Sequence, residues 1–142
     1  MNLLGFGGKV TSATYLEEQP MFTTEETQEY KQKNSEETKQ ILNYTEEKID
    51  MVLAHYPPYT FFDKVNSTED NPMNNQHAGF KGYKTFIEQS SASLFICGHM
   101  HEYQGKQEYE DTTIISTGPA YNGEAAIVTT KNKEIDHIQF IK

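Results

Sequence analysis

Three short segments, each long enough for one strand, constrain the fold of this chain more than any other feature. They are Ile49–Ala54, Leu94–Cys97 and Thr112–Ser116. Segments of about four to six residues make a strand of ordinary length but are too short for a typical globular helix. The first two are apolar almost throughout, which is typical of strands buried on both faces of a parallel sheet.

Two helices and three more strands are predicted around these segments. A polar, exposed helix is expected over Thr23–Glu47, because Thr23 and Glu26 have capping-box spacing, with a break near Asn34. A second helix is expected over Lys81–Gln89, where apolar side chains recur at helical spacing. The further strands are predicted at Asn2–Gly8, Ala125–Thr130 and Ile135–Ile141. This order predicts an α/β fold with a partly parallel sheet and antiparallel strands at its edge.

The charge of the chain narrows the classes of partner. The 142 residues include 21 acidic and 12 basic side chains, for a net charge of −9. Such a surface repels phosphate backbones and anionic lipid, so we expect neither non-specific nucleic-acid binding nor membrane binding. All the basic residues are lysines, which leaves phosphate recognition to Lys, backbone amides or metal ions.

The length of the chain indicates the number of domains, and its cysteine content indicates the cellular compartment. A chain of 142 residues has the length of one ordinary domain. No apolar run approaches the roughly 20 residues of a membrane span, and the first residues lack the pattern of a signal peptide. Cys97 is the single cysteine, which excludes an intrachain disulfide and is typical of a reducing compartment. We therefore expect a cytoplasmic protein.

Three of the five histidines directly follow predicted buried strands. His55 comes after Ile49–Ala54, and His99 and His101 come after Leu94–Cys97. Ligands of open α/β sheets bind beyond the carboxyl ends of the strands, and neutral imidazole is a common ligand of borderline metals. We expect these side chains to converge on a metal site; the competing interpretation is that they are polar loop residues.

The surroundings of these histidines resemble a known family. The segments Met51–Tyr59, Leu94–Glu102 and Thr113–Pro119 are similar to the last three sequence blocks of the calcineurin-like metallophosphoesterases. Gly5–Gly8 resembles the glycine-rich strand end that precedes a helical insert in one branch of that family. A strand followed by His-x-Pro-Pro and, further on, a strand followed by Gly-His-x-His form a specific combination. The resemblance covers nearly the whole chain.

The resemblance implies a fold, a reaction and a set of metal ligands. The family fold is an α/β/β/α sandwich that holds two divalent metal ions of the manganese, iron or zinc class. Family members hydrolyse phosphomonoesters or phosphodiesters. By resemblance, His55 and His99 would bind one metal and His101 the other. Two metals roughly 4 Å apart clamp the phosphoryl oxygens and activate the attacking water.

The chain differs from the family because it lacks several of the family's sequence blocks. The earlier family blocks, Asp-x-His, Gly-Asp-x-x-Asp and Gly-Asn-His or Gly-Asn-Asp, are absent from the sequence. Residues 1–142 therefore resemble the C-terminal half of a single, partial metallophosphoesterase domain. Three neutral imidazoles leave the repulsion between two dications uncompensated, so the chain alone cannot hold two metals. We expect a polypeptide that supplies the N-terminal half, or a homo-oligomer, to complete the site.

The sequence leaves the roles of four other residues open. Tyr56 and His77 are candidates for substrate binding, against the simpler alternatives of local packing and a solvated loop. Glu102 is either a hydrogen-bond acceptor that fixes an imidazole tautomer or a solvated side chain. No role is assigned to His137, and no catalytic residue is identified with certainty.

Two further functions remain open besides the dinuclear phosphoesterase. One is a mononuclear zinc hydrolase in which His55, His99 and His101 bind a single ion and leave its fourth position open. The other is a non-catalytic remnant that acts as an interaction module, because half of a sandwich leaves a sheet face in need of a partner.

Overall fold

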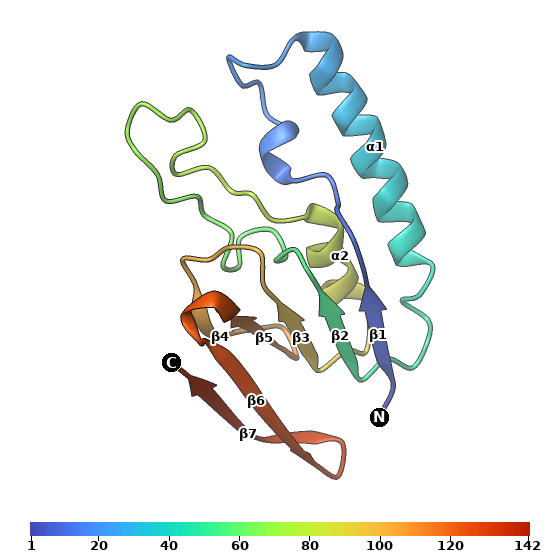
Figure 1. Cartoon of the computed structure of the whole chain (residues 1–142). Helices are drawn as coiled ribbons and strands as arrows, with labels where there is room; N and C mark the ends of the chain where they lie inside the picture. The colour runs from blue at the N-terminus through green and yellow to red at the C-terminus, as the bar shows by residue number, and fades with distance from the viewer.

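The computed structural model describes all 142 residues, and a five-stranded sheet forms its centre (Figure 1). Across the sheet the strands are β1 (Leu3–Phe6), β2 (Met51–Ala54), β3 (Leu94–Cys97), β5 (Thr112–Thr117) and β4 (Gln104–Tyr109). The first four of these are parallel, and β4 pairs antiparallel with β5 at one edge. The predicted α/β class and the mixed sheet are therefore confirmed.

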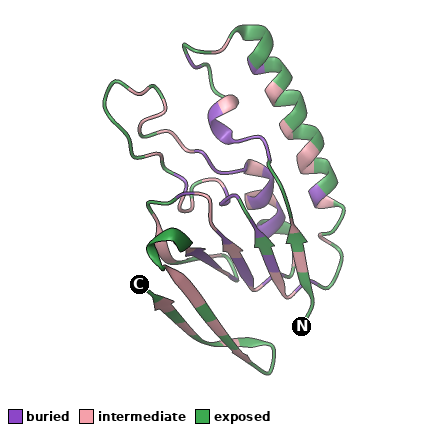
Figure 2. Ribbon diagram, in the orientation of Figure 1, coloured by how far each residue is buried: buried purple, intermediate pink, exposed green.

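The helices and a separate hairpin surround this sheet. Along the chain, α1 (Thr24–Leu42) lies between β1 and β2, and α2 (Lys81–Gln89) lies between β2 and β3. Two short 3₁₀ helices are also present, η1 (Ala13–Tyr15) and η2 (Ala120–Asn122). The chain ends in a two-stranded antiparallel hairpin of β6 (Ala125–Lys131) and β7 (Glu134–Ile141). In Figure 2 the buried residues lie in the sheet, in α2, η1 and part of α1, and in the loops between them, and none lies in the hairpin.

α1 begins where its sequence predicts and does not break. Thr23 accepts a hydrogen bond from the Glu26 backbone N–H (3.1 Å), and the Glu26 carboxylate accepts one from the Thr23 N–H (2.7 Å), which completes the capping box. The break expected near Asn34 is wrong, because the Asn34 amide donates to the Thr11 carbonyl (3.2 Å) instead of competing with the backbone of its own helix.

The strand β4 was not predicted from the sequence. Its six residues, Gln-Gly-Lys-Gln-Glu-Tyr, are mostly polar and carry no apolar alternation. They form a strand because each of them pairs with a residue of β5 at the sheet edge. A polar edge strand with charged side chains is the usual protection against pairing with other chains.

The two faces of the sheet differ sharply in exposure. On the helix-facing side, β2, β3 and β5 contribute Val52, Phe95 and Ile114, which are all fully buried in one core with α2. The opposite side carries the open face, which we define by its residues Leu3, Met51, Leu53 and Ile96. Leu3 is 60% exposed and Leu53 is 48% exposed. This part of the sheet presents apolar side chains without a layer over them.

None of the helices combines the length and apolar character needed to cross a membrane.

The open face leads to a prediction about stability. Leu94 and Leu53 lie on the same side of adjacent strands, but Leu94 is fully buried whereas Leu53 is half exposed. We expect Leu94→Ala to lower the free energy of unfolding by about 2–5 kcal/mol, because it leaves a cavity, and Leu53→Ala to lower it by less than about 1 kcal/mol. Urea denaturation followed by circular dichroism measures both values. Equal losses would mean that Leu53 is covered in solution.

Candidate functional site

Parallel pairing of β2 with β3 brings two of the predicted histidines into contact. His55 directly follows β2, and His99 follows β3 after Gly98. The Gly98 N–H donates to the His55 carbonyl (3.1 Å), which ties the two strand ends together. His55 Nε2 and His99 Nδ1 are 3.1 Å apart, so one imidazole donates to the other or both nitrogens face a shared ligand. We call these two side chains the histidine pair.

The backbone and a tyrosine ring hold His99 in place. Its φ of 68° lies in the left-handed region, which residues other than glycine seldom occupy. The next residue, Met100, is buried, and its N–H donates to the Gly98 carbonyl (2.8 Å). The ring of Tyr56 stacks on the His99 imidazole, with centroids 4.0 Å apart and an interplanar angle of 26°. Strain of this kind persists where the surrounding structure enforces it, often at functional sites.

The surroundings of His99 favour its neutral form. Burial is the main cause that lowers its pKa, and the nearby His55 and His101 lower it further. Lys9 contributes in the same direction, whereas Glu102 opposes the shift. A neutral imidazole offers the lone pair that metal binding requires.

His101 does not join the histidine pair. It is exposed, and its Nδ1 lies 3.4 Å from the Tyr121 hydroxyl. No three His, Cys, Asp or Glu side chains converge in a geometry that could hold a metal ion. The structure therefore does not form the three-histidine arrangement that a mononuclear zinc hydrolase would need.

The histidine pair has a geometry compatible with two ligands of one ion. Two nitrogens each about 2.0–2.1 Å from a tetrahedral zinc ion lie roughly 3.3–3.4 Å from each other. The observed separation of 3.1 Å needs only a small adjustment to match it. Imidazole nitrogens suit zinc, iron and related metals. The residues present can thus supply part of a metal site.

A cavity connects the histidine pair with the open face. It has a volume of about 430 Å³ and is lined by Gly5, Phe6, Gly7, Leu53, Ala54 and His55. Leu53 belongs to the open face and His55 to the histidine pair. A polypeptide packed on the open face would therefore come within reach of His55.

A second histidine is oriented by a buried carboxylate that sequence reasoning did not single out as its partner. Asp63 is 1% exposed, and its Oδ1 lies 2.7 Å from His77 Nδ1. Asp63 Oδ2 accepts hydrogen bonds from the backbone N–H groups of Thr60 and Gly79, both at 3.0 Å. Such a carboxylate fixes the tautomer of the imidazole and leaves His77 Nε2 free to contact another group. The sequence holds no signal for this pair, because 13 residues of irregular loop separate its members.

Gly79 has a packing role in that loop. A Cβ atom at this position would lie 2.6 Å from the Pro58 carbonyl oxygen and 2.8 Å from Asp63 Oδ2. Only glycine lets the two loop segments approach this closely. The loop that carries His77 is therefore tied to the segment that follows His55.

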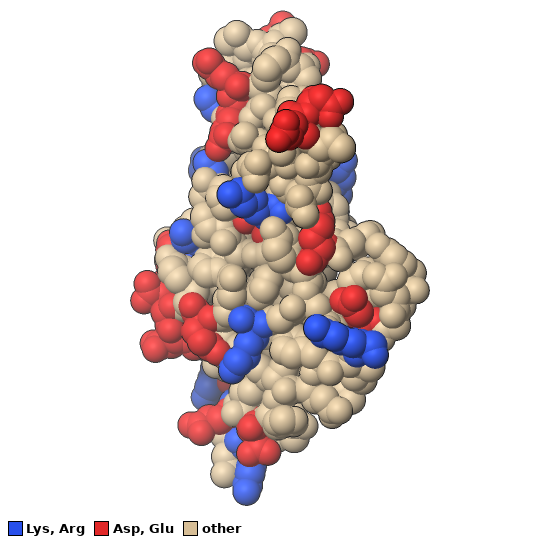
Figure 3. Space-filling model, turned by 90° about the vertical axis from the view of Figure 1, so that its left-hand side faces the viewer, with Lys and Arg blue, Asp and Glu red and all other residues tan.

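The remaining candidates lie on the surface. His137 is exposed on β7, and Glu102 is exposed beside His101. On the face shown in Figure 3, lysines alternate with acidic side chains and form no continuous basic patch.

Comparisons with known proteins match this chain to one family by sequence and find two solved structures with some similarity to it. Residues 1–140 match a family described as metallophosphoesterase, calcineurin superfamily. A search of curated proteins by sequence finds no match. One crystal structure is similar with a TM-score of 0.52 and 18% identity, over 75% of this chain and 38% of that one. The crystal structure of TT1561 of Thermus thermophilus has a TM-score of 0.45 and 12% identity, over 97% of this chain and 51% of that one. The chain thus spans about half or less of the length of these proteins.

The environment of His99 leads to a prediction about pH. In an unfolded chain a histidine titrates near pH 6.5, and in the folded chain burial moves the pKa of His99 below this value. Between the two values the unfolded chain binds more protons, so the contribution of His99 to stability falls as the pH drops below about 6.5. Titration of the imidazole resonances by NMR should give a midpoint below 6.5 for His99, and a higher midpoint in His55→Ala. A wild-type midpoint at or above 6.5 would contradict the assignment.

Proposed function

The chain belongs to the metallophosphoesterases of the calcineurin superfamily, and we propose that it contributes to the metal-dependent hydrolysis of phosphomonoesters or phosphodiesters. The observation that carries this proposal is the histidine pair at the ends of β2 and β3, with its nitrogens 3.1 Å apart. A divalent metal of the manganese, iron or zinc class, when bound there, supplies Lewis-acid activation of the phosphoryl group and of water.

The residues of this chain have distinct tasks in the proposal. His55 and His99 hold one metal through neutral imidazoles, and the stacked ring of Tyr56 keeps the His99 imidazole in its orientation. His101, exposed and two residues from His99, is the proposed ligand of a second metal. His77, fixed by Asp63, is proposed to contact the substrate through its free Nε2.

We further propose that polypeptide outside these 142 residues completes the metal site. Two dications held close together need carboxylates to offset their repulsion, and no carboxylate converges on the histidine pair. The open face supports this proposal, because Leu3 and Leu53 remain exposed beside the cavity that reaches His55. A segment of a longer chain, a separate polypeptide or a second copy would each cover the face; sheets pack face to face in this way in sandwich folds.

A second candidate function is that of a non-catalytic interaction module. The exposed apolar side chains of the open face favour it, because contiguous apolar surface of this kind marks protein contacts. Under this alternative the chain forms a monodisperse complex through the open face and binds no metal.

Metal binding distinguishes the two. We expect His55→Ala and His99→Ala each to weaken Mn²⁺ binding by about tenfold or more, because each removes one ligand, whereas His137→Ala, on the exposed face of β7, leaves it unchanged. Paramagnetic line broadening of the imidazole resonances by added Mn²⁺ reports the affinity. Broadening that is indifferent to both pair variants would contradict the proposed metal role.

Activity should require the additional polypeptide. We expect the 142-residue chain with Mn²⁺ to hydrolyse bis(p-nitrophenyl) phosphate weakly or not at all, and a mixture with the N-terminal half of a related phosphoesterase to be more active. Release of p-nitrophenol measures both. Robust hydrolysis by the chain alone, abolished by His99→Ala, would mean that its own carboxylates complete the site.

A further inference from the structure

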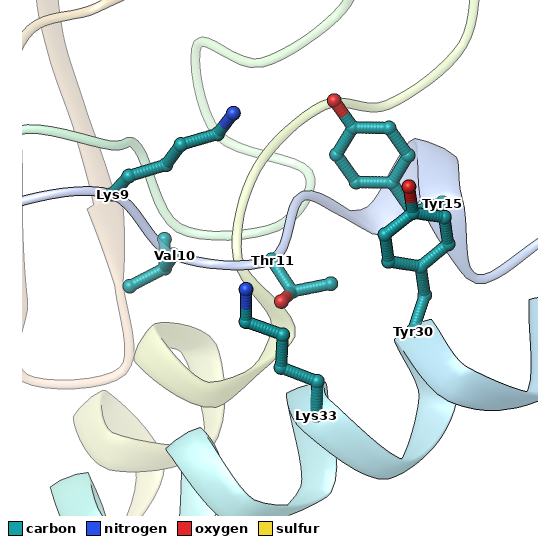
Figure 4. A pocket seen from close by; sticks show the side chains of 6 residues that line it. All are labelled: Lys9, Val10, Thr11, Tyr15, Tyr30 and Lys33. Carbon is teal, nitrogen blue, oxygen red and sulfur yellow. The ribbon is translucent and has the colours of Figure 1, made fainter. Parts of the chain in front are cut away.

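A cavity of about 290 Å³ lies between α1 and the segment that follows β1 (Figure 4). It is lined by Lys9, Val10, Thr11, Tyr15, Tyr30 and Lys33. In Figure 4 the ammonium groups of the two lysines lie on one side of this space and the two tyrosine rings on the other. We call it the lysine–tyrosine cavity. Its walls come from three elements, so its shape exists only in the folded chain.

The aromatic wall of the cavity is preformed. The rings of Tyr15 and Tyr30 stack with centroids 4.6 Å apart and an interplanar angle of 26°. Phe22 meets both rings edge-on, at 5.3 Å from Tyr15 and 5.5 Å from Tyr30. These contacts fix the tyrosine rings, so a planar ligand would meet a surface that needs little ordering.

The opposite wall of the cavity carries two lysine side chains. Neither Lys9 nor Lys33 lies within 4.0 Å of a carboxylate, although the chain has 21 acidic residues. No acidic residue lines the cavity. The nearby carboxylate of Glu37 on α1 is engaged by the backbone N–H of Thr11 (2.8 Å). Two lysines at one cavity, free of ion pairs, provide an electrostatic site for an anion.

The segment that carries Lys9 leaves the sheet beside the strand that leads into His55. Phe6 pairs with Ala54 in parallel register, so the chain leaves β1 toward Lys9 beside the point where β2 leads into His55. Lys9 and Val10 also line a second cavity. That second cavity shares Gly5, Phe6 and Gly7 with the lining of the cavity at His55.

We propose that the lysine–tyrosine cavity binds the aromatic group of the substrate, which is then a phosphate ester carrying a single planar ring system. This inference rests on the proposed phosphoesterase function and narrows its substrate class. The ring stacks on the Tyr15–Tyr30 wall, and Lys9 and Lys33 attract the phosphate on the opposite side of the cavity. A volume of about 290 Å³ is at the lower end of ligand cavities and suits one phenyl group or one nucleobase.

Binding to matched probes tests the proposal without catalysis. Isothermal titration calorimetry with the 142-residue chain in EDTA compares phenylphosphonate with methylphosphonate, and adenosine 5′-monophosphate with ribose 5-phosphate. We expect the aromatic member of at least one pair to bind about tenfold or more tightly, because only it stacks on the tyrosines. The pair with the larger difference identifies an aryl or a nucleobase substituent. Equal affinities within both pairs would overturn the proposal.

Three variants and one control assign the effect to the cavity. Tyr30→Leu should abolish the preference for the aromatic probe, whereas Tyr30→Phe, which keeps the ring, should retain it. Lys33→Gln should weaken both members of a pair alike, and Lys39→Gln, on an exposed site in the last turn of α1, should change neither. Circular dichroism confirms that each variant is folded. A preference that persists in folded Tyr30→Leu would overturn the assignment.

The two proposals fail separately. Because EDTA removes metal from the probe measurements, loss of the ring preference with intact Mn²⁺ binding contradicts the cavity inference alone. Mn²⁺ binding that is indifferent to His55→Ala and His99→Ala contradicts the proposed phosphoesterase function.

Discussion

The parallel hydrogen bonding between β2 and β3 is the constraint on which the candidate site depends. It aligns the carboxyl ends of two strands that are about 40 residues apart in sequence and sets His55 against His99. The bond from the Gly98 N–H to the His55 carbonyl extends this pairing one step beyond the strands. A shift of the register between β2 and β3 by one residue would turn one imidazole to the other face of the sheet and separate the two histidines.

One face of the sheet is covered by the helices, whereas the opposite face is exposed at β1 and β2. α1 and α2 cover the side that carries Val52 and Phe95, which gives the chain a continuous core. On the other side Leu3 and Leu53 stay exposed, although apolar side chains gain free energy when they leave water. Both this imbalance and the absence of a carboxylate at the histidine pair support the proposal that additional polypeptide covers the open face and supplies the remaining ligands.

We propose that aromatic rings and lysines provide substrate recognition in this chain, which contains no arginine. Tyr56 stacks on His99, and Tyr15 and Tyr30 form a second stack a short distance away. Lys9 connects the two by contributing positive charge near the imidazoles and to the adjacent cavity. In the proposed function the histidine pair holds the metal that activates the phosphate, and the tyrosines and lysines of the cavity select the group that the phosphate carries.

The sequence by itself determined the elements that depend on local pattern. The apolar runs defined β2 and β3, the Thr23–Glu26 capping box defined the start of α1, and the motifs around His55 and His99 indicated the family. Tertiary structure decided what depends on contacts between distant residues. Pairing with β5 made a strand of polar β4, the turn after His99 kept His101 apart, loop packing joined Asp63 to His77, and helix packing formed the lysine–tyrosine cavity. These contacts arise between segments whose local sequences carry no signal of one another, so only the folded chain, which closes the intervening loops, brings them together.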